Sequence, residues 1–420
     1  MITNIMLFTV ILFLIIIIYS IIVKFDIISP TITFIGSFLL CSLAYMNIID
    51  FWKTDLRSDT ILLMSVSCIT FMIVSTFVDY YFHNNRRISK TIFKFHEISK
   101  GVYLFFAFVS LIYILIGFQN INLYTSIEYK KMISENAISS YYISIQINKI
   151  LLAFSYVALY KILVNIIVRK MTIKSQCLGI ITIILCNIAF SMTGLSRQNF
   201  IEFIIASFTI WIVLKRKIGE IAIKDIFYPV ITTLILPIAF FYSSDIVGRD
   251  FNRISTYGAQ RYVSIYMSCG INFFNKEIID KPFNTEYIGQ SSFAGMFKNL
   301  IGILIPENVQ DMTKHYFSID YGNTVTMFGR WYEDGGAVMV LLMTIILAII
   351  TTYYYNKYIK YKNDFSFHLI IYAKYIGVLL WAGYDNRLAL LISLDQCQQV
   401  AYLYILFVLL LKTKVRIKLW

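Results

Sequence analysis

The sequence is poor in charged residues, cysteine and proline. Of its 420 residues only 15% are charged, whereas 58% are hydrophobic. Five prolines and eighteen glycines are too few for a linker-rich or low-complexity protein. The six cysteines form no CxxC pair and no cluster with metal-ligand spacing, so they indicate neither a disulfide framework nor a metal centre. Linker-rich proteins, low-complexity proteins, and small domains held together by disulfides or clustered metal ligands are therefore excluded.

Other signatures are missing as well. The N-terminal stretch MITNIMLFTVILFLIIIIYSIIVK has no basic n-region and no small-residue cleavage site, so we expect it to stay as a membrane span. The sequence contains no GxSxG, Walker A or HExxH motif, and no DxD or ExD in a predicted outer loop. We therefore expect no metal and no cofactor. No internal repeat relates the two halves, which disfavours an inverted-repeat transporter.

What the chain has in abundance is long apolar runs, and a span takes about 20 such residues. They predict an all-α polytopic integral membrane protein with about eleven transmembrane helices and one long extracytoplasmic loop. The expected spans are 2–23, 31–49, 60–82, 101–119, 149–168, 175–194, 199–214, 226–243, 335–355, 366–383 and 389–411. The chain is accordingly expected to have three parts. Residues 1–244 hold the first eight helices, residues 245–334 form the loop or cap with short helices, and residues 335–420 hold the last three helices.

Basic residues set the expected orientation. The formal net charge is +13, which by itself is compatible with nucleic-acid binding. The lysines and arginines, however, gather in alternate connections, at 24, 86–100, 169–174, 215–224, 357–362 and 412–418. The positive-inside rule then predicts an outer N-terminus, a cytoplasmic C-terminus and an outer location for 245–334. Because topology explains the charge, no nucleic-acid partner is expected.

Four arginines are candidates for binding a diphosphate. Arg197 lies in the short turn SMTGLSRQNFIEF between two spans, so its guanidinium is held near one depth. Arg249 and Arg253 are four residues apart and would share a helix face, and Arg261 follows in the same loop. A guanidinium matches phosphate oxygens two at a time. The alternatives are an interfacial anchor for Arg197 and surface ion pairs for the others.

Acid–base candidates lie in the same loop. His315 is the one histidine on the predicted outer side, and its side chain suits general-base chemistry at neutral pH. Glu333 and Asp334 precede Gly335 at the expected start of the ninth span. They could be catalytic carboxylates, or they could simply cap that helix. Within the seventh span, Glu202 is a functional candidate, or a partner of Arg197 or Lys374.

Aromatic side chains accompany these groups. Tyr262, Trp331 and Tyr332 are candidates for stacking on sugar rings, with a small loop core as the alternative. In the last span a polar band should face the protein interior, consisting of Asp395, Gln396, Gln398 and Gln399. The apolar stretch Phe293–Pro306 is too short to cross a membrane and predicts an interfacial or re-entrant helix.

Three stretches resemble a known family. MTGLSRQNFIEF, STYGAQRYVSIYMSCGINFFNKEI and NTVTMFGRWYEDGGAV resemble segments of bacterial O-antigen and capsule repeat-unit polymerases of the Wzy type, over roughly Ser191 to Val338. Those proteins are related to O-antigen ligases. By position, Arg197 and Arg261 match the family's arginines and Asp334 its acidic residue. The resemblance implies a GT-C-like membrane glycosyltransferase that needs no metal.

The same resemblance implies the reaction and its partners. A growing glycan would pass from undecaprenyl diphosphate to the non-reducing end of a lipid-linked repeat unit, at the outer face of the bacterial inner membrane. Donor and acceptor would both be undecaprenyl-diphosphate-linked oligosaccharides in membrane lipid, with a chain-length-regulating co-polymerase as a further partner. Two alternatives stay open at this point: a flippase or other transporter of lipid-linked oligosaccharides, and an O-antigen ligase.

Overall fold

The computed structural model describes residues 3–23, 25–84, 91–123, 141–194, 198–220, 258–283, 285–296, 324–361, 366–391 and 393–418. Within these ranges the chain is mainly helical, with one two-stranded antiparallel ribbon. Eight of the described helices are long and apolar enough to cross a membrane. The chain is therefore an α-helical membrane protein.

Two compact units divide the chain, and each draws on separate stretches of sequence. Unit 1 comprises residues 1–88, 257–362 and 375–397, and unit 2 comprises residues 89–256, 363–374 and 398–420. The described parts of the expected cap, 258–283, 285–296 and 324–334, all belong to unit 1. That 245–334 forms a cap of its own stays a prediction.

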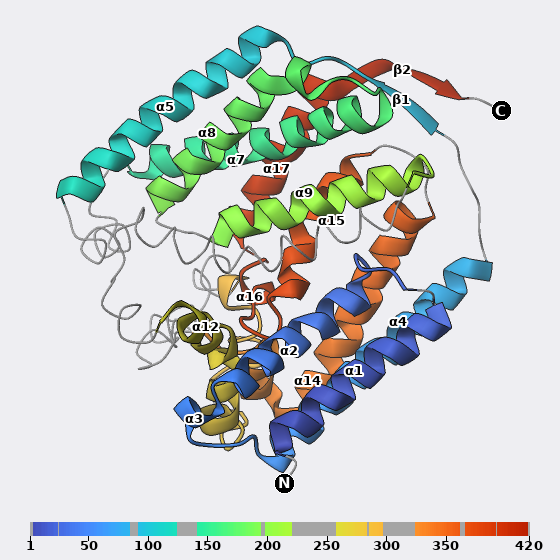
Figure 1. Ribbon diagram of the computed structural model, residues 1–420, viewed down its shortest axis with the longest axis vertical. Helices are drawn as coiled ribbons and strands as arrows, with labels where there is room; N and C mark the ends of the chain where they lie inside the picture. Colours follow the sequence, from blue (N-terminus) through green and yellow to red (C-terminus); the bar gives the residue numbers. More distant parts are fainter. Residues whose placement is uncertain are drawn as a thin grey trace. The chain divides into compact units, whose positions relative to one another are not determined.

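Unit 1 is built around four long helices (Figure 1). Its elements are α1 (Asn4–Val23), α2 (Pro30–Asn47), α3 (Ile49–Trp52), α4 (Ser58–Asn84), α12 (Ala259–Phe273), α13 (Ala294–Met296), α14 (Met327–Tyr354) and α16 (Leu388–Leu391). Helix α1 packs against α2 and α4, α14 packs against α4, and α12 packs along α2. At about 1.5 Å per residue, the 20 residues of α1 span roughly 30 Å, the thickness of a bilayer core.

Buried aromatic rings hold the centre of unit 1 together. Phe34 stacks on Phe71 with ring centroids 4.2 Å apart, and Phe38 stacks on Phe328 at 4.6 Å. All four rings are fully buried. Such pairs contribute about 0.5–1.5 kcal/mol beyond the area they bury. The start of α14 is thereby fixed against α2 and α4.

Unit 2 contains the remaining elements. They are β1 (Thr91–Phe95), α5 (Lys100–Leu123), α7 (Tyr141–Leu163), a 3-10 turn (Ile173–Gln176), α8 (Cys177–Gly194), α9 (Gln198–Lys217) and β2 (Lys412–Lys418). Helices α15 (Phe367–Leu380) and α17 (Leu394–Leu411) contribute residues to both units. Helix α8 packs against α5 and α7 (Figure 1), and β1 pairs with β2.

The outward faces of the helices are apolar. On α5, Leu104, Phe105 and Phe108 have exposed fractions of 57%, 61% and 65%. On the opposite side of the same helix Phe106 stacks on Phe154 of α7, with centroids 3.7 Å apart. Large apolar side chains that stay exposed along whole helices are unusual for a water-soluble surface. They are the expected lipid-facing surface of a membrane protein.

Ten of the eleven predicted spans overlap described helices. The tenth predicted span corresponds to the short helix α15, and the seventh to α9; neither is among the eight helices above. The eighth, 226–243, lies outside the described residues. The ninth was expected to begin at residue 335 but α14 begins at Met327, because Thr326 caps it by accepting the backbone N–H of Gly329 at 3.3 Å. The count of eleven stays a prediction.

Contacts at the helix ends agree with the predicted alternation of connections. In unit 1, Tyr355 donates to Asp26, and Lys360 Nζ lies 3.0 Å from Asp79 Oδ1. These pairs join connections that were all predicted to lie on one side. In unit 2, Lys170 pairs with Glu220 at 2.6 Å, and β1 with β2, again joining connections predicted to share a side. Which side is cytoplasmic stays a prediction.

Candidate functional site

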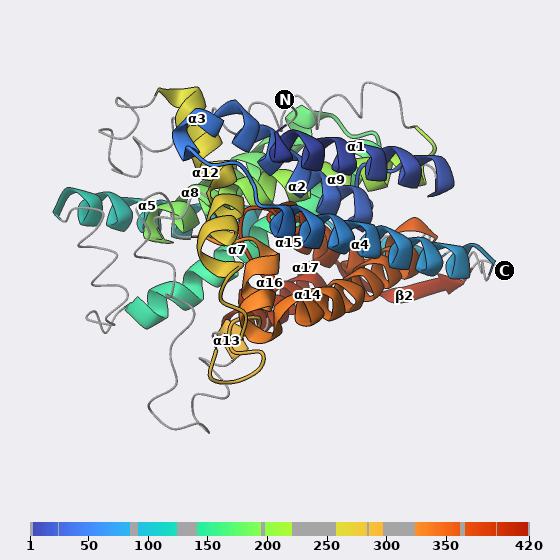
Figure 2. The ribbon, with the colours of Figure 1, turned by 90° about the horizontal axis from the view of Figure 1, so that it is seen from below.

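Helix α12 is held against the ends of the membrane helices by hydrogen bonds between side chains. Asn47 Nδ2 donates to Ser264 Oγ at 2.9 Å, and Trp52 Nε1 donates to Ser268 Oγ at 3.0 Å. Figure 2 shows α12 beside α3. Ser264 and Ser268 lie four residues apart, so they face the same neighbour one turn apart. Within the segment predicted to be a loop or cap with short helices, α12 is a firmly placed helix.

The connection between α3 and α4 continues this contact. Asn275 Oδ1 accepts hydrogen bonds from Thr60 Oγ1 and from the backbone N–H of Arg57, both at 2.8 Å. About one turn after Asn275, Asp280 follows, and its Oδ2 atom lies 2.5 Å from Arg57 Nη1. The hydrogen bond from Arg57 and its positive charge lower the pKa of the Asp280 carboxyl. The end of α12 is thus fixed to α4.

On the other side of α12, Gly270 allows the helix to pack closely against the backbone at Tyr384. A Cβ atom added at Gly270 would lie 2.3 Å from the backbone oxygen of Tyr384, well inside contact distance. The side chain of Tyr384 stacks on Tyr266 of α12, with ring centroids 5.0 Å apart. Only glycine permits this approach without displacing backbone.

Arg261 is the one candidate arginine among the described residues, and it is exposed at the start of α12. Its Cζ atom lies 5.5 Å from the centroid of the Phe51 ring, which is a cation–π distance. The next residue, Tyr262, is half-buried with its ring 6.3 Å from that of Tyr266. An exposed guanidinium beside an aromatic ring, on a fixed helix, is suited to binding an anion at the surface of unit 1.

Glu333 and Asp334 are buried, and both hold the segment 285–292. Asp334 Oδ1 accepts from Thr285 Oγ1 at 2.9 Å and from the backbone N–H of Ser291 at 3.0 Å, while its Oδ2 accepts from the N–H of Ser292 at 2.7 Å. Glu333 Oε2 accepts from Ser291 Oγ at 2.8 Å. In this geometry Asp334 anchors a turn through three donors. Its expected role as a catalytic carboxylate stays a prediction.

The glycines that follow these acids divide α14 into two helical parts. Glu333 and Asp334 lie at the end of the first part, just before Gly335 and Gly336, where φ and ψ are not helical. Gly336 has φ of +59°, a conformation that glycine adopts readily. Thr326 caps the first part, and whether the acids also cap the second part stays a prediction. The sequence pattern missed the short polar helical segment that comes before the double glycine.

The two aromatic candidates of α14 are placed differently from each other. Trp331 is fully buried, with its ring centroid 5.9 Å from that of Phe328, so it has no surface with which to stack on a sugar in this structure. Tyr332 is half-buried; its hydroxyl donates to the backbone oxygen of Ile279 at 3.0 Å, and its ring lies 5.7 Å from Phe274. Trp331 is therefore a core residue of unit 1.

Four predicted site residues lie outside the described residues: Arg197, Arg249, Arg253 and His315. Most of the predicted interfacial segment Phe293–Pro306 does so too, apart from its first four residues. No protein family, curated protein or solved structure matches this chain. Within the described ranges, no three His, Cys, Asp or Glu side chains gather as a metal site requires. Metal independence stays a prediction.

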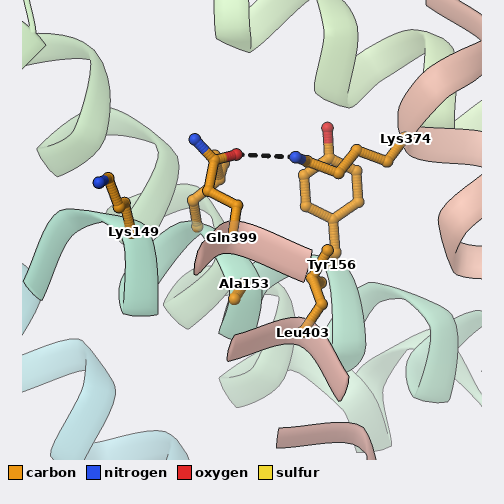
Figure 3. Close-up of a pocket in the computed structure, with 7 residues that line it drawn as sticks. Lys149, Ala153, Tyr156, Lys374, Gln399 and Leu403 are labelled. Atoms are coloured by element: carbon orange, nitrogen blue, oxygen red, sulfur yellow. Dashed lines mark hydrogen bonds between the residues drawn. The ribbon is translucent and has the colours of Figure 1, made fainter. Parts of the chain in front are cut away.

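A polar pocket in unit 2 was only partly foreseen (Figure 3). It is lined by side chains of α7, α15 and α17, among them Lys149, Tyr156, Lys374 and Gln399. Of the polar band predicted to face the interior of the protein, Gln399 lines the pocket, whereas Asp395 is exposed. Lys149 was missed, although a lysine within the apolar run IQINKILLAF is a sufficient signal.

Two further features belong to this pocket. Glu202 of α9 acts electrostatically on Lys374, the partner considered for it from sequence. Tyr402 donates its hydroxyl to Gln146 Oε1 at 3.0 Å, which fixes the neighbouring turns of α7 and α17 to each other. The pocket is thus a built feature of unit 2, supported by hydrogen bonds between its helices.

Proposed function

We propose that this chain is a metal-independent membrane glycosyltransferase of the oligosaccharide repeat-unit polymerase type. It transfers a growing glycan from undecaprenyl diphosphate to the non-reducing end of a lipid-linked repeat unit. The reaction takes place at the outer face of the bacterial inner membrane. Support comes from the three sequence stretches that resemble the Wzy-type polymerases and from the membrane helices of the chain.

The observation that carries the proposal is the placement of Arg261. Its side chain is exposed, yet α12 is fixed by hydrogen bonds to Asn47, at the end of α2, and to Trp52 of the adjoining short helix α3. A cation held in this way needs little rearrangement to meet the charge that develops on a leaving diphosphate. Its position at the ends of the membrane helices suits a lipid-linked donor, whose diphosphate lies at the membrane surface.

The chemistry needs one base as well. The acceptor hydroxyl oxygen attacks the anomeric carbon of the donor sugar, the bond from that carbon to the diphosphate oxygen breaks, and the hydroxyl proton passes to the base. Asp334 is engaged by three hydrogen-bond donors in unit 1. We therefore favour His315 as the base over Asp334 and Glu333.

A second candidate is transport of a lipid-linked oligosaccharide, and one observation favours it. Lys149 of the membrane helix α7 and Lys374 of the shorter apolar helix α15 are buried and line a common pocket. Ionisable groups within spans often mark the path of a charged substrate. An O-antigen ligase would use the same arginines and a different acceptor.

The test is reconstitution of the purified protein in liposomes that contain undecaprenyl-diphosphate-linked repeat units, with EDTA present. The proposal expects a ladder of glycans of two or more repeat units. Translocation of the repeat unit without any elongation would establish the transporter instead. Transfer to a lipid A core acceptor, with no ladder on undecaprenyl diphosphate, would establish the ligase. A ladder that forms only when Mg²⁺ or Mn²⁺ replaces EDTA would contradict metal independence.

A further inference from the structure

Two lysines from different helices line one pocket within unit 2. Lys149 of α7 has an exposed fraction of 4%, and Lys374 of α15 one of 8%. Both line the same pocket, whose other walls include the apolar side chains of Leu152 and Leu403 (Figure 3). Placing even one ammonium group in such surroundings is costly, and ionisable residues within spans usually serve a substrate or ion.

Glutamines of α17 hold both ammonium groups. Lys149 Nζ donates to Gln398 Oε1 at 2.8 Å, and Lys374 Nζ donates to Gln399 Oε1 at 2.7 Å. Figure 3 shows Gln399 between the two lysines, with its amide oxygen directed at Lys374. A glutamine oxygen is a neutral acceptor, so it satisfies the geometry of an ammonium donor without supplying a full negative charge.

We propose that this pocket is an anion site that binds the phosphate or diphosphate group of a lipid-linked substrate. Lys149 and Lys374 supply the positive charge, and Gln398 and Gln399 supply amide N–H donors beside it. That the anion is lipid-linked rests on the proposed function; that the pocket binds a phosphate group does not.

Phosphate suits these groups for three reasons. It carries several oxygens, so a single group can accept from two ammonium groups and from amide donors at the same time. An ammonium is a compact charge with three donors that binds phosphate without a fixed orientation, unlike a guanidinium. No carboxylate is among the seven residues that line the pocket, although the charge of Glu202 acts on Lys374.

The glutamine oxygens act as internal substitutes for the oxygens of the anion. The space between these side chains is too small to hold even a water molecule in this structure. A phosphate group therefore enters by displacing Gln398 and Gln399 from the ammonium groups. The substitution keeps both ammonium groups hydrogen-bonded when no anion is bound.

The experiment measures binding, without turnover, in lipid nanodiscs that contain the full-length protein. The probes are undecaprenyl diphosphate, undecaprenol and inorganic pyrophosphate. The variants are Lys149→Met and Lys374→Met, which keep an unbranched side chain one atom shorter and remove its charge, and a control, Lys170→Met, on the exposed surface of the same unit. A third variant, Gln399→Glu, keeps both lysines and places a carboxylate beside Lys374, where it competes with the anion.

Undecaprenyl diphosphate should raise the melting temperature of the wild type and of Lys170→Met, and undecaprenol should not. Binding should weaken by about tenfold or more in each Lys→Met variant and in Gln399→Glu, because one charge-assisted contact is lost or blocked. Competition by inorganic pyrophosphate would show that the anion alone is recognised; its failure, with lipid binding intact, would assign the site to the lipid headgroup.

Equal affinity in the wild type and all three pocket variants would overturn the proposal, as would equal stabilisation by undecaprenol. A Lys→Met variant that does not fold leaves the decision to Gln399→Glu, which removes no buried charge. The polymerisation assay is separate. A protein that binds undecaprenyl diphosphate through Lys149 and Lys374 but forms no ladder would keep this site and lose the proposed polymerase activity.

Discussion

Ser292 donates its backbone N–H to Asp334 Oδ2 over 2.7 Å, and so joins two parts of the chain that are 42 residues apart. With the N–H of Ser291 on the other carboxylate oxygen, Asp334 binds two successive peptide groups. A carboxylate that accepts several hydrogen bonds in a buried place is strongly tied to its partners. Most of the hydrogen bonds that join residues 285–292 to α14 therefore converge on Asp334, with one further bond to Glu333.

Asp334→Asn should loosen this attachment. The amide has nearly the same shape but lacks the charge, and one of its two oxygens becomes a donor that faces a peptide N–H. The expected loss is about 3 kcal/mol of unfolding free energy, with faster proteolysis within 283–292. Limited proteolysis and melting temperature in detergent measure it. Glu277→Gln is the control, because Glu277 forms only an exposed pair with Lys281. Equal protection of both variants would contradict the anchoring role.

Arg261→Lys should impair polymerisation by about a hundredfold, because a lysine offers a point charge instead of a two-pronged donor. Arg197→Lys is expected to behave alike. The readout is the length distribution of the surface glycan in cells where each variant is the sole copy. Lys281→Arg, on the exposed surface of unit 1, is the control. Long chains made normally by Arg261→Lys would remove this residue from the diphosphate site.

Unit 2 should lose stability in acid through Glu97. Partial burial acts to raise the pKa of this carboxyl, but hydrogen bonds from Lys161 and Asn165 and the charges of Lys161 and Arg169 outweigh it and leave the pKa below its ordinary 4.5. A carboxyl with a lowered folded-state pKa stabilises the fold above its unfolded pKa, and this contribution disappears as the pH falls through the folded value. Stability should therefore drop below about pH 4.5.

Melting temperature as a function of pH tests this, with Glu97→Gln as the variant. The variant should be less stable than the wild type at pH 7, and the two should converge in acid. Glu220→Gln serves as the control, since Glu220 pairs with Lys170 at a well-exposed site. A constant difference between Glu97→Gln and the wild type across the whole pH range would exclude the linkage.

Cysteine labelling tests the orientation. Two exposed side chains, Ile288 and Ile173, have exposed fractions of 79% and 65%, and they lie in connections predicted to be outside and inside. Each is replaced by cysteine in a background where Cys177 and Cys397 are serine. A membrane-impermeant maleimide should modify Ile288→Cys in spheroplasts and Ile173→Cys only after permeabilisation. The reverse pattern would invert the topology.

The membrane helices could be predicted because an apolar run of about 20 residues has few other stable structures. The start of α14 could not, because TMFGRWYED is polar and becomes helical only where Arg330, Glu333 and Asp334 are buried inside unit 1. Helix α12 was predictable in part. Its small polar residues at 264, 268, 272 and 275 follow a helical period, which predicts one face packed on another helix.

The candidate site was less accessible to sequence analysis. Residue type suggested that Trp331 could bind a sugar, but exposure decides that role and depends on packing against Phe328. Lys149 and Lys374 are 225 positions apart in the sequence (374 − 149), so no local pattern relates them. Their common pocket follows only from how α7, α15 and α17 pack.

Among the helices that the structure describes, three end in a wider, π-helical turn, and each such turn has a buried asparagine as its second residue. The turns are Val164–Val168 after α7, Phe274–Ile278 after α12 and Tyr355–Lys360 after α14, with Asn165, Asn275 and Asn356. A π-helical turn behaves as a one-residue insertion into an α-helix. Removing one residue there would turn everything that follows by about 100°. Asp280, just past the second turn, would then swing away from Arg57, so the length of each helix end is as constrained as its composition.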